Sequence, residues 1–429
     1  MPITFSKKAQ LAIDKVQETN DNIFVTGKAG TGKSTLLEYI RNYTSKKIIL
    51  LAPTGISAIN INGDTIHSFF KLKPGFEKAE AEKMRIDEKK EKKFKRIETI
   101  AIDEISMVRA DLLDAIDIVL RRTRKNDQPF GGVQMVFFGD LYQLPPVVTS
   151  VDREKFFSEY TLPYFFGAEV FKTRFDLFST KFELEIIELT EMYRQKDMDF
   201  IHVLNAVRNN SVDHNHLNTL NTRFFPDFTP EDKDNYIYLM TTNASARKVN
   251  DEKLAQLPEE ERMYLSEKTG DIAKNLHPND EMITIKVGAQ VMFICNDAER
   301  KWVNGTIGKV IEINGDRVLV EKTNGDMVDV KKHTWEISRY TFDKGQFERE
   351  IIGSFTQMPM KLAWAITIHK SQGKTFDKVI IDLGRGSFAH GQTYVALSRC
   401  TTLEGVILKK RMYKSSIIMD TRIRNFEVK

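Results

Sequence analysis

The residues best suited to chemistry form a glycine-rich loop near the start of the sequence. The loop spans residues 27–34 (GKAGTGKS), follows the apolar run 23–26 and precedes the helix-like stretch 34–43. A strand, a glycine loop and a helix in this order are typical of a phosphate-binding loop, whose backbone N–H groups face the phosphates. Lys33 would reach the β- and γ-phosphates of ATP, and Ser34 would bind Mg²⁺. The predicted nucleotide contacts here are Gly27, Ala29, Gly30, Thr31, Gly32, Lys33, Ser34 and Thr35.

Two carboxylates follow another apolar run. Asp103 and Glu104 come directly after residues 100–102, so we expect them at the carboxyl end of a strand, where open α/β sheets bind ligands. Asp103 can orient Mg²⁺, and Glu104 can polarise the attacking water. Such a pair is common by chance. Its position downstream of the glycine loop, with a further strand between, supports the catalytic interpretation.

A third candidate is the segment 139–146 (GDLYQLPP), which follows the apolar run 135–138. Gln143 could hydrogen-bond a γ-phosphate or its attacking water. Pro145 and Pro146 stiffen the chain after it, which suits a loop that transmits movement. An ordinary proline-rich turn is the alternative interpretation.

The apolar runs also predict the fold class. Those at 23–26, 48–52, 100–102 and 135–138 alternate with helix-like stretches, and later runs repeat the pattern. Continuous apolar strands separated by helices predict an α/β fold with parallel sheets covered on both faces. Between the later runs, Asn-Gly pairs recur at a spacing of about ten residues and favour two-residue hairpin turns, so we expect a small antiparallel barrel inserted there.

Residues 71–96 interrupt the first α/β region. They hold eleven Lys or Arg against six Asp or Glu, an excess of five positive charges. The segment is either a solvated surface excursion, the commoner fate of a charge run, or a small insertion beside a nucleic-acid path. The net charge of the whole chain is only +4, which permits nucleic acid as a partner without arguing for it.

Other totals exclude several classes. Cys295 and Cys400 lie far apart and beside no metal-spaced histidines, which argues against zinc and fits a reducing compartment. Residues 1–17 lack an apolar signal core, and no run of about 18 apolar residues could span a membrane. We therefore expect a cytoplasmic protein with no membrane partner.

Taken together, the motifs resemble those of the Pif family (petite integration frequency), in the 5′→3′ branch of superfamily one helicases. Single motifs are weak, but their joint order is specific and covers nearly the whole chain. The matching stretches are Phe5-Ser6 with Gln10, then 27–34, 52–55, 65–69, 102–107, 111–114, 130–132, 138–140, 189–194, 367–373 and 394–399.

This resemblance implies two RecA-like lobes, at 1–180 and 181–429. The basic segment 71–96 would be the wedge element of the first lobe, and an SH3-like barrel at about 297–357 would be inserted in the second. The compact length leads us to expect a minimal helicase core from a bacterium, where it would be nucleoid-associated, or from a virus.

The resemblance also implies roles for single residues. Gln10 would contact the adenine, Gly373 and Lys374 would lie near the nucleotide, and Arg194 and Arg399 would be arginine fingers that stabilise charge on the transferred phosphoryl group. With these, the predicted catalytic residues are Lys33, Glu104, Gln143, Arg194 and Arg399.

DNA contacts would come from hydroxyls suited to phosphate oxygens and from rings suited to base stacking. The residues implied are Thr54, His67, Phe69, Pro146, His369 and Ser371. Phe69 could instead belong to the core, and either histidine could be structural. Trp364, next to the last of these motifs, is interpreted as core.

The implied function is an ATP-dependent 5′→3′ DNA helicase of replication, recombination, repair or telomere-type maintenance. It would act as a monomer on single-stranded DNA and on single/double-strand junctions, with G-quadruplexes and RNA–DNA hybrids as further candidate substrates. Two other classes are an ATPase that uses ATP as a switch and a nucleic-acid-binding module with a decayed ATP site. A complete set of catalytic residues in one chain favours the helicase.

Overall fold

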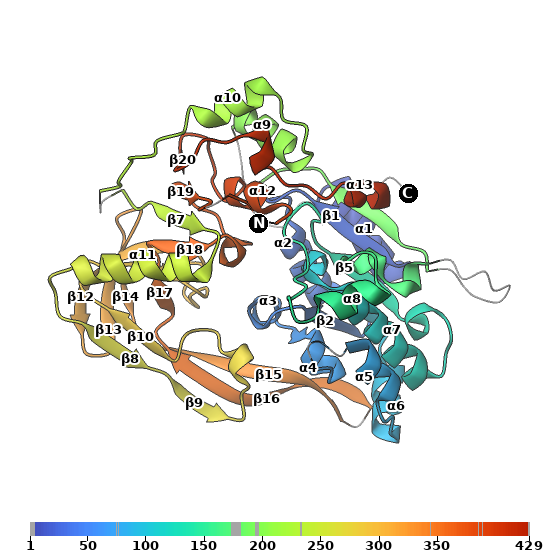
Figure 1. The fold of residues 1–429 in the computed structure, drawn as a ribbon. Helices are drawn as coiled ribbons and strands as arrows, with labels where there is room; N and C mark the ends of the chain where they lie inside the picture. The colour runs from blue at the N-terminus through green and yellow to red at the C-terminus, as the bar shows by residue number, and fades with distance from the viewer. Residues whose placement is uncertain are drawn as a thin grey trace.

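The computed structural model describes residues 5–73, 75, 77–172, 182–193, 197–231, 234–343, 345–384, 386–387 and 389–427. Figure 1 shows two parts built on parallel strands and a third, antiparallel part that extends from the second. We call the parts built on parallel sheets the first and second lobes, and the antiparallel part, residues 262–362, the insert. Among the described residues, no helix is long and apolar enough to cross a membrane.

The first lobe is built on a six-stranded parallel sheet of order β3-β2-β4-β5-β1-β6. Its strands are β1 (Ile23–Gly27), β2 (Ile48–Ala52), β3 (Asp64–Thr65), β4 (Thr99–Ile102), β5 (Gln134–Phe138) and β6 (Glu185–Leu189). The strands predicted from the apolar runs are thus present. Strand β6 pairs along the whole of β1, so the first sheet extends past residue 180, where the sequence placed the lobe boundary.

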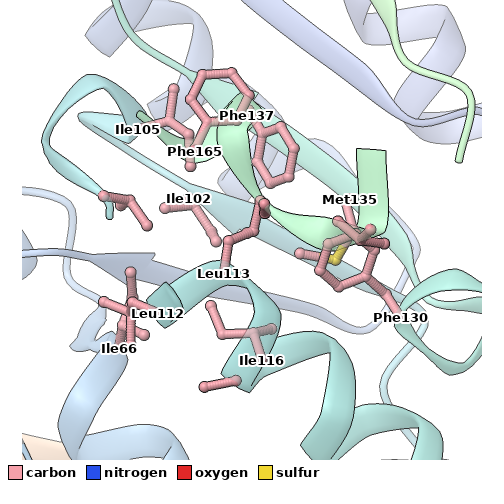
Figure 2. Close-up of a cluster of buried hydrophobic side chains, with 14 of the residues drawn as sticks. Ile66, Ile102, Ile105, Leu112, Leu113, Ile116, Phe130, Met135, Phe137 and Phe165 are labelled. Carbon is pink, nitrogen blue, oxygen red and sulfur yellow. The ribbon is translucent and has the colours of Figure 1, made fainter. Parts of the chain in front are cut away.

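Helices cover both faces of this sheet because its central strands are apolar on both sides. On one face, α1 (Lys7–Glu18) and α2 (Lys33–Tyr43) pack against side chains such as Val25 and Val136. On the other, α7 (Ala110–Arg124) packs against the alternate side chains of the same strands. Figure 2 shows Leu113 of α7 directed toward Ile102 and the strand side chains, and Leu112 of the same helix beside Ile66.

The basic segment after α4 (Ile66–Phe70) forms two short helices, α5 (Glu77–Lys83) and α6 (Glu88–Lys95). Ala81 and Phe94 are buried in the core of the first lobe. Most of the charged side chains remain outside, where Glu88–Lys92 forms an exposed pair and Glu91–Lys95 a partly exposed one, each four residues apart. The segment therefore combines a solvated charged face with a packed apolar one.

The second lobe has a four-stranded parallel sheet of order β18-β7-β19-β20. Its strands are β7 (Ile237–Met240), β18 (Ala365–Thr367), β19 (Val379–Asp382) and β20 (Val406–Leu408), and its helices are α9 (Met198–Arg208), α10 (His214–Asn221), α11 (Asn243–Gln256) and α12 (Gln392–Leu397). Apolar side chains of α9 and α12 are buried with those of the sheet in one cluster.

The insert lies between α11 and β18 and is wider than the predicted span of about 297–357. Its strands are β8 (Arg262–Leu265), β9 (Glu267–Gly270), β10 (Met282–Ile285), β11 (Gln290–Phe293), β12 (Ile307–Asn314), β13 (Arg317–Lys322), β14 (Met327–Val330), β15 (His333–Asp343), β16 (Gln346–Gln357) and β17 (Met360–Leu362). Five of them form the antiparallel sheet β14-β13-β12-β11-β17. Asn314 pairs with Arg317 across a two-residue turn made by Gly315, at φ 58°, and Asp316. A hairpin turn therefore lies at the predicted Asn-Gly pair, but only the glycine of the pair is in the turn.

The segment 413–427 returns from the second lobe to the first, and we call it the crossing segment. It ends in the helix α13 (Arg422–Glu427), whose Ile423 is fully buried in the core of the first lobe. The Phe426 ring stacks on that of Phe166, with 4.4 Å between ring centroids. Figure 1 accordingly shows α13, in dark red, beside the blue and green elements of the first lobe.

Candidate nucleotide and nucleic-acid site

The glycine loop connects β1 to α2, as predicted. Gly30 and Gly32 have φ angles of 88° and 84°, which lie in the left-handed region that favours glycine. Gly27 is required for a second reason, because a Cβ there would lie 2.6 Å from the backbone oxygen of Leu189. The tight path directs the N-terminus of α2, and its positive end, toward the predicted phosphate position.

Lys33, the first residue of α2, folds back over the loop. Its Nζ donates hydrogen bonds to the carbonyls of Gly27, at 2.6 Å, and Lys28, at 3.1 Å. Loss of hydration lowers the pKa of Lys33, and the carboxylates of Asp140 and Glu104 oppose this shift. A cation that faces several carboxylates across a partly dehydrated site is suited to binding phosphate oxygens.

Asp103 and Glu104 follow β4 directly, at the carboxyl end of the strand. The Asp103 carboxylate accepts a hydrogen bond from the Glu104 N–H at 2.9 Å. Burial raises the pKa of Asp103. It also raises the pKa of Glu104 to about 7, with a second contribution from the Asp103 charge, while Lys33 and Arg399 oppose the shift. A carboxyl group that titrates near neutral pH is suited to accept a proton from water.

Loop 139–146 leaves β5 of the first lobe and is buried against the second. Gln143 donates to the Asp140 carboxylate at 3.2 Å. The same carboxylate pairs with Arg208 of α9 at 3.1 Å, and both side chains are buried. Leu144 belongs to the core of the second lobe. The loop therefore joins the two lobes at the carboxyl edge of the first sheet.

Arg399 follows α12 and is almost fully buried, with 1% of its surface exposed. Its guanidinium donates to the carbonyls of Ser371, at 3.2 Å, and Lys374, at 3.3 Å. Tyr394 of the same helix accepts a hydrogen bond from the Ala29 N–H of the glycine loop at 3.2 Å. The second lobe thus touches the glycine loop directly. Arg194, the other predicted finger, lies outside the described residues.

The remaining predicted nucleotide contacts are spread over several elements. Ser34 and Thr35 are exposed at the start of α2, and Gln10 is exposed on α1, where its amide donates to Asp14 at 2.8 Å. Gly373 is exposed with φ 75°. Lys374 has its ammonium hydrogen-bonded to Asn304 of the insert, and burial lowers its pKa to about 8.

The predicted DNA contacts divide between the lobes. Thr54 caps α3 (Gly55–Asn60), with its hydroxyl accepting from the Ser57 N–H. Ser371 is buried, and its hydroxyl donates to the Ile368 carbonyl at 2.7 Å. His67 and His369 are half-buried, burial lowers the pKa of His369, and Pro146 is buried. The hydroxyls therefore already make local hydrogen bonds in this arrangement.

Phe69 is buried in the first lobe rather than open to a base. The Tyr340 ring of the β15–β16 hairpin lies against it edge to face at 6.0 Å, and the Lys93 ammonium lies 3.9 Å from its ring centroid. The Tyr340 N–H donates to Asp64 at 2.8 Å. In this arrangement Phe69 is a core residue and is not exposed for base stacking.

The insert also covers α3. A Cβ on Gly55 would lie 2.5 Å from the carbonyl oxygen of Asn275. Ile59 of α3 packs in a cluster with Leu276 and with Trp335 of the hairpin. Figure 1 shows the β15–β16 hairpin, in orange, reaching the blue helices of the first lobe. The surface next to Thr54 is therefore in contact with the insert.

Two residues at the candidate nucleotide site were missed in the sequence. Tyr394 lies within a stretch that matched the family, yet only Arg399 of that stretch received a role. Arg208 lies outside every matched motif, and nothing in its local sequence distinguishes it from the surface arginines of other helices. Its position became evident only when α9 was placed beside loop 139–146.

Comparison with known proteins gives consistent matches. The sequence model of a family described as PIF1-like helicase matches residues 6–218. The ATP-dependent DNA helicase Pif1 of Bdellovibrio bacteriovorus is 33% identical over 99% of this chain and 92% of its own length. The crystal structure of Bacteroides sp Pif1 in complex with ADP-AlF4 has a TM-score of 0.90 and 38% identity, and covers 100% of this chain and 97% of that one. Bacteroides Pif1 bound to ssDNA, with the same identity and coverage, has a TM-score of 0.68.

The Asp140–Arg208 pair predicts a measurable coupling between the lobes. Asp140→Ala should destabilise the protein by about 3–5 kcal/mol, because it leaves the Arg208 charge buried without its carboxylate. The double variant Asp140→Ala/Arg208→Ala should be less destabilised than the sum of the single variants, by about 1–3 kcal/mol. Equilibrium urea unfolding measures all three, with the exposed Glu169–Lys172 pair as the matched control. If the losses in free energy of unfolding of the two single variants add up to that of the double variant, the two side chains are not energetically coupled and the prediction is wrong.

Proposed function

Because this chain belongs to the PIF1-like helicase family and is an ATP-dependent DNA helicase, we propose that it tracks single-stranded DNA 5′→3′ by closing and opening the cleft between its two lobes. The observation that carries the proposal is the meeting of both lobes at the glycine loop, where Tyr394 contacts Ala29. A nucleotide bound to this loop would touch both lobes. Hydrolysis would then change the packing of the two lobes and move the protein along DNA. An ATPase that uses ATP only as a switch would not step in this way, and a protein with a decayed ATP site would not hydrolyse ATP.

We assign the phosphate contacts to residues of the first lobe. Phosphate oxygens would replace the carbonyls of Gly27 and Lys28 as acceptors for the Lys33 ammonium. Gln143 would orient the attacking water, and Glu104 would accept its proton. Each of these side chains lies at the carboxyl edge of the first sheet, which supports the assignment.

The residues around the loop fit Mg²⁺. The described residues hold no cluster of three or more His, Cys, Asp or Glu side chains that could bind a metal by itself. Mg²⁺ commonly takes one or two protein ligands and completes its shell with waters and substrate phosphates, so the Ser34 hydroxyl and the Asp103 carboxylate suffice. When bound, the ion would neutralise phosphate charge. Asp103, whose pKa is raised by burial, would be held in its charged form.

The arginines of the second lobe complete the proposal. Arg399 would exchange the carbonyls of Ser371 and Lys374 for phosphate oxygens when the cleft closes, and Arg194 would act beside it. Because Arg399 is bonded to the same segment that carries His369 and Ser371, its movement would be transmitted to the proposed DNA contacts. Gln10, Gly373 and Lys374 stay proposed as nucleotide contacts.

We propose that the insert changes position when DNA binds. It lies on α3 and Phe69, two of the places where DNA would contact the first lobe. The similarity to Bacteroides Pif1 is also higher for the ADP-AlF4 complex than for the DNA-bound form, with TM-scores of 0.90 and 0.68. Movement of Tyr340 away from Phe69 would remove one of the groups that cover this ring.

Finer assignments rest on the family resemblance. Residues 71–96 would act as a wedge at the single/double-strand junction, and the insert would contain an SH3-like barrel that helps to enclose the strand. G-quadruplexes and RNA–DNA hybrids are proposed as further substrates. We propose action as a monomer in the cytoplasm, on the nucleoid in a bacterium, during replication, recombination or repair.

The direction of unwinding tests the proposed function. A duplex with a 5′ single-stranded tail should be unwound in the presence of ATP and Mg²⁺, whereas the same duplex with a 3′ tail should stay intact. Strand separation is measured as the release of a fluorescently labelled strand. Lys33→Ala is the matched control, since it should lose unwinding while its affinity for single-stranded DNA stays within about threefold, because Lys33 serves the phosphates of ATP and not those of DNA. Preference for the 3′ tail would contradict the proposal.

The pKa of Glu104 predicts a pH dependence. Its raised pKa of about 7 means that the carboxylate, the form able to accept a proton, predominates above that pH and is lost below it. The kcat/KM for ATP with saturating single-stranded DNA should therefore fall as the pH is lowered through about 7. Glu104→Gln should lose at least about a hundredfold in kcat, whereas the exposed control Glu154→Gln should not. An unchanged rate in Glu104→Gln would remove Glu104 from the mechanism.

A further inference from the structure

The crossing segment is bonded to both lobes. On the second lobe, its Ser416 carbonyl accepts from the Thr393 hydroxyl at 2.6 Å, and its Ile418 carbonyl accepts from the Gly391 N–H at 3.0 Å. On the first lobe, its Asp420 carboxylate accepts from the Tyr164 hydroxyl at 3.1 Å. The helix α13 then packs into the core of the first lobe through Ile423. The segment therefore links α12 to the framework of the first lobe.

His390 lies where this segment, α12 and loop 139–146 meet, and it is buried. The Asp420 N–H donates to its Nδ1 at 2.9 Å, and its Nε2 lies 2.8 Å from the Leu141 carbonyl oxygen. A backbone N–H can only donate, so Nδ1 must be the acceptor. The proton of the neutral ring is therefore on Nε2, which donates to Leu141. His390 thus joins a backbone donor of one segment to a backbone acceptor of another.

Loop 139–146 has little freedom beside this histidine. A Cβ on Gly391 would lie 2.3 Å from the Gln143 carbonyl oxygen, so the backbones of the two segments are in close contact. Farther along the loop, Leu144 is buried in the second lobe. On the other side of His390, α12 begins at Gln392 and leads to Arg399. One side chain therefore lies between the loop that carries Gln143 and the helix that leads to the arginine.

We propose that His390 is a positioning residue for ATP hydrolysis. Its Nε2–H holds the Leu141 carbonyl so that Gln143 and the helix leading to Arg399 move together when the cleft closes. In this role His390 acts through loop 139–146, by way of its hydrogen bond to Leu141, and not by contact with the nucleotide or DNA. The inference rests on the proposed function, because it takes Gln143 and Arg399 to be the groups that meet at the γ-phosphate.

The test uses three variants of the full chain. His390→Gln keeps an N–H donor near the position of Nε2, His390→Asn keeps an acceptor near the position of Nδ1, and His390→Ala keeps neither. His390→Ala should lower the kcat of DNA-stimulated ATP hydrolysis by about tenfold, as expected when a buried carbonyl loses its donor. The KM for ATP and the affinity for single-stranded DNA should change by less than about twofold, since a positioning group affects the transition state more than binding.

The comparison of His390→Gln with His390→Asn tests whether the hydrogen bond to Leu141 sets kcat, even if His390→Ala fails to fold. His390→Gln should recover kcat to within about threefold of wild type, because it can still donate to Leu141, and His390→Asn should stay low. Lys414→Ala, an exposed position in the crossing segment, is the control and should behave as wild type. Unfolding temperatures of all variants separate a loss of stability from a loss of rate.

Three results would overturn the inference. They are a wild-type kcat in His390→Ala despite a lowered unfolding temperature, equal recovery by His390→Asn and His390→Gln, and a loss of kcat in His390→Gln as large as in His390→Asn. Failure of the proposed function looks different, since wild type itself would then show no ATP hydrolysis that depends on DNA. Active wild type with an equally active His390→Ala contradicts the inference alone.

Discussion

Asp140 and Arg208 form a buried ion pair between a loop of the first lobe and a helix of the second. Two charges removed from water are stable together but costly apart, so loop 139–146 has to stay in register with α9 even though it leaves a strand of the first sheet. Gln143 is on that loop, Lys33 is at the start of α2, and Glu104 comes directly after β4. The proposed nucleotide site is consequently an interface between the lobes, and in the proposed mechanism a charge change at the γ-phosphate would act on the packing of both.

The proposed DNA contacts share elements with this interface. Ser371 offers its carbonyl to Arg399, and its own hydroxyl is a proposed contact for the DNA backbone. If DNA binds there as proposed, a shift of this segment would also shift the arginine. The affinities for ATP and DNA would then be linked, and each ligand would alter the binding of the other by the same factor. The insert lies on α3, and its Tyr340 lies against Phe69. In the proposed mechanism the insert must therefore move before DNA can contact these two places.

Local patterns predicted the parts of the fold that depend on neighbouring residues. The glycine loop and Asp103-Glu104 were recognisable because strand, loop and helix follow one another within a few residues, and the Asn314-Gly315 turn was recognisable because it needs a positive φ. Contacts between distant segments left no such pattern. Arg208 reads as the end of an ordinary amphipathic helix, and the burial of Phe69 depends on a hairpin some 270 residues away. The insert was predicted too narrow because its first strands, from Arg262, carry no turn signal as clear as the Asn-Gly pairs.

The central claim is that DNA completes the nucleotide site by bringing Arg399 from its carbonyl partners to the γ-phosphate. Steady-state ATP hydrolysis of wild type and Arg399→Ala, each measured across a titration of single-stranded DNA, tests it directly. Wild-type kcat should rise with DNA to a plateau, and Arg399→Ala should still bind DNA yet lose most of the stimulation, by about a thousandfold if it behaves as other arginine fingers do. A wild-type rate indifferent to DNA, or full stimulation of Arg399→Ala, would contradict closure of the cleft as the coupling step.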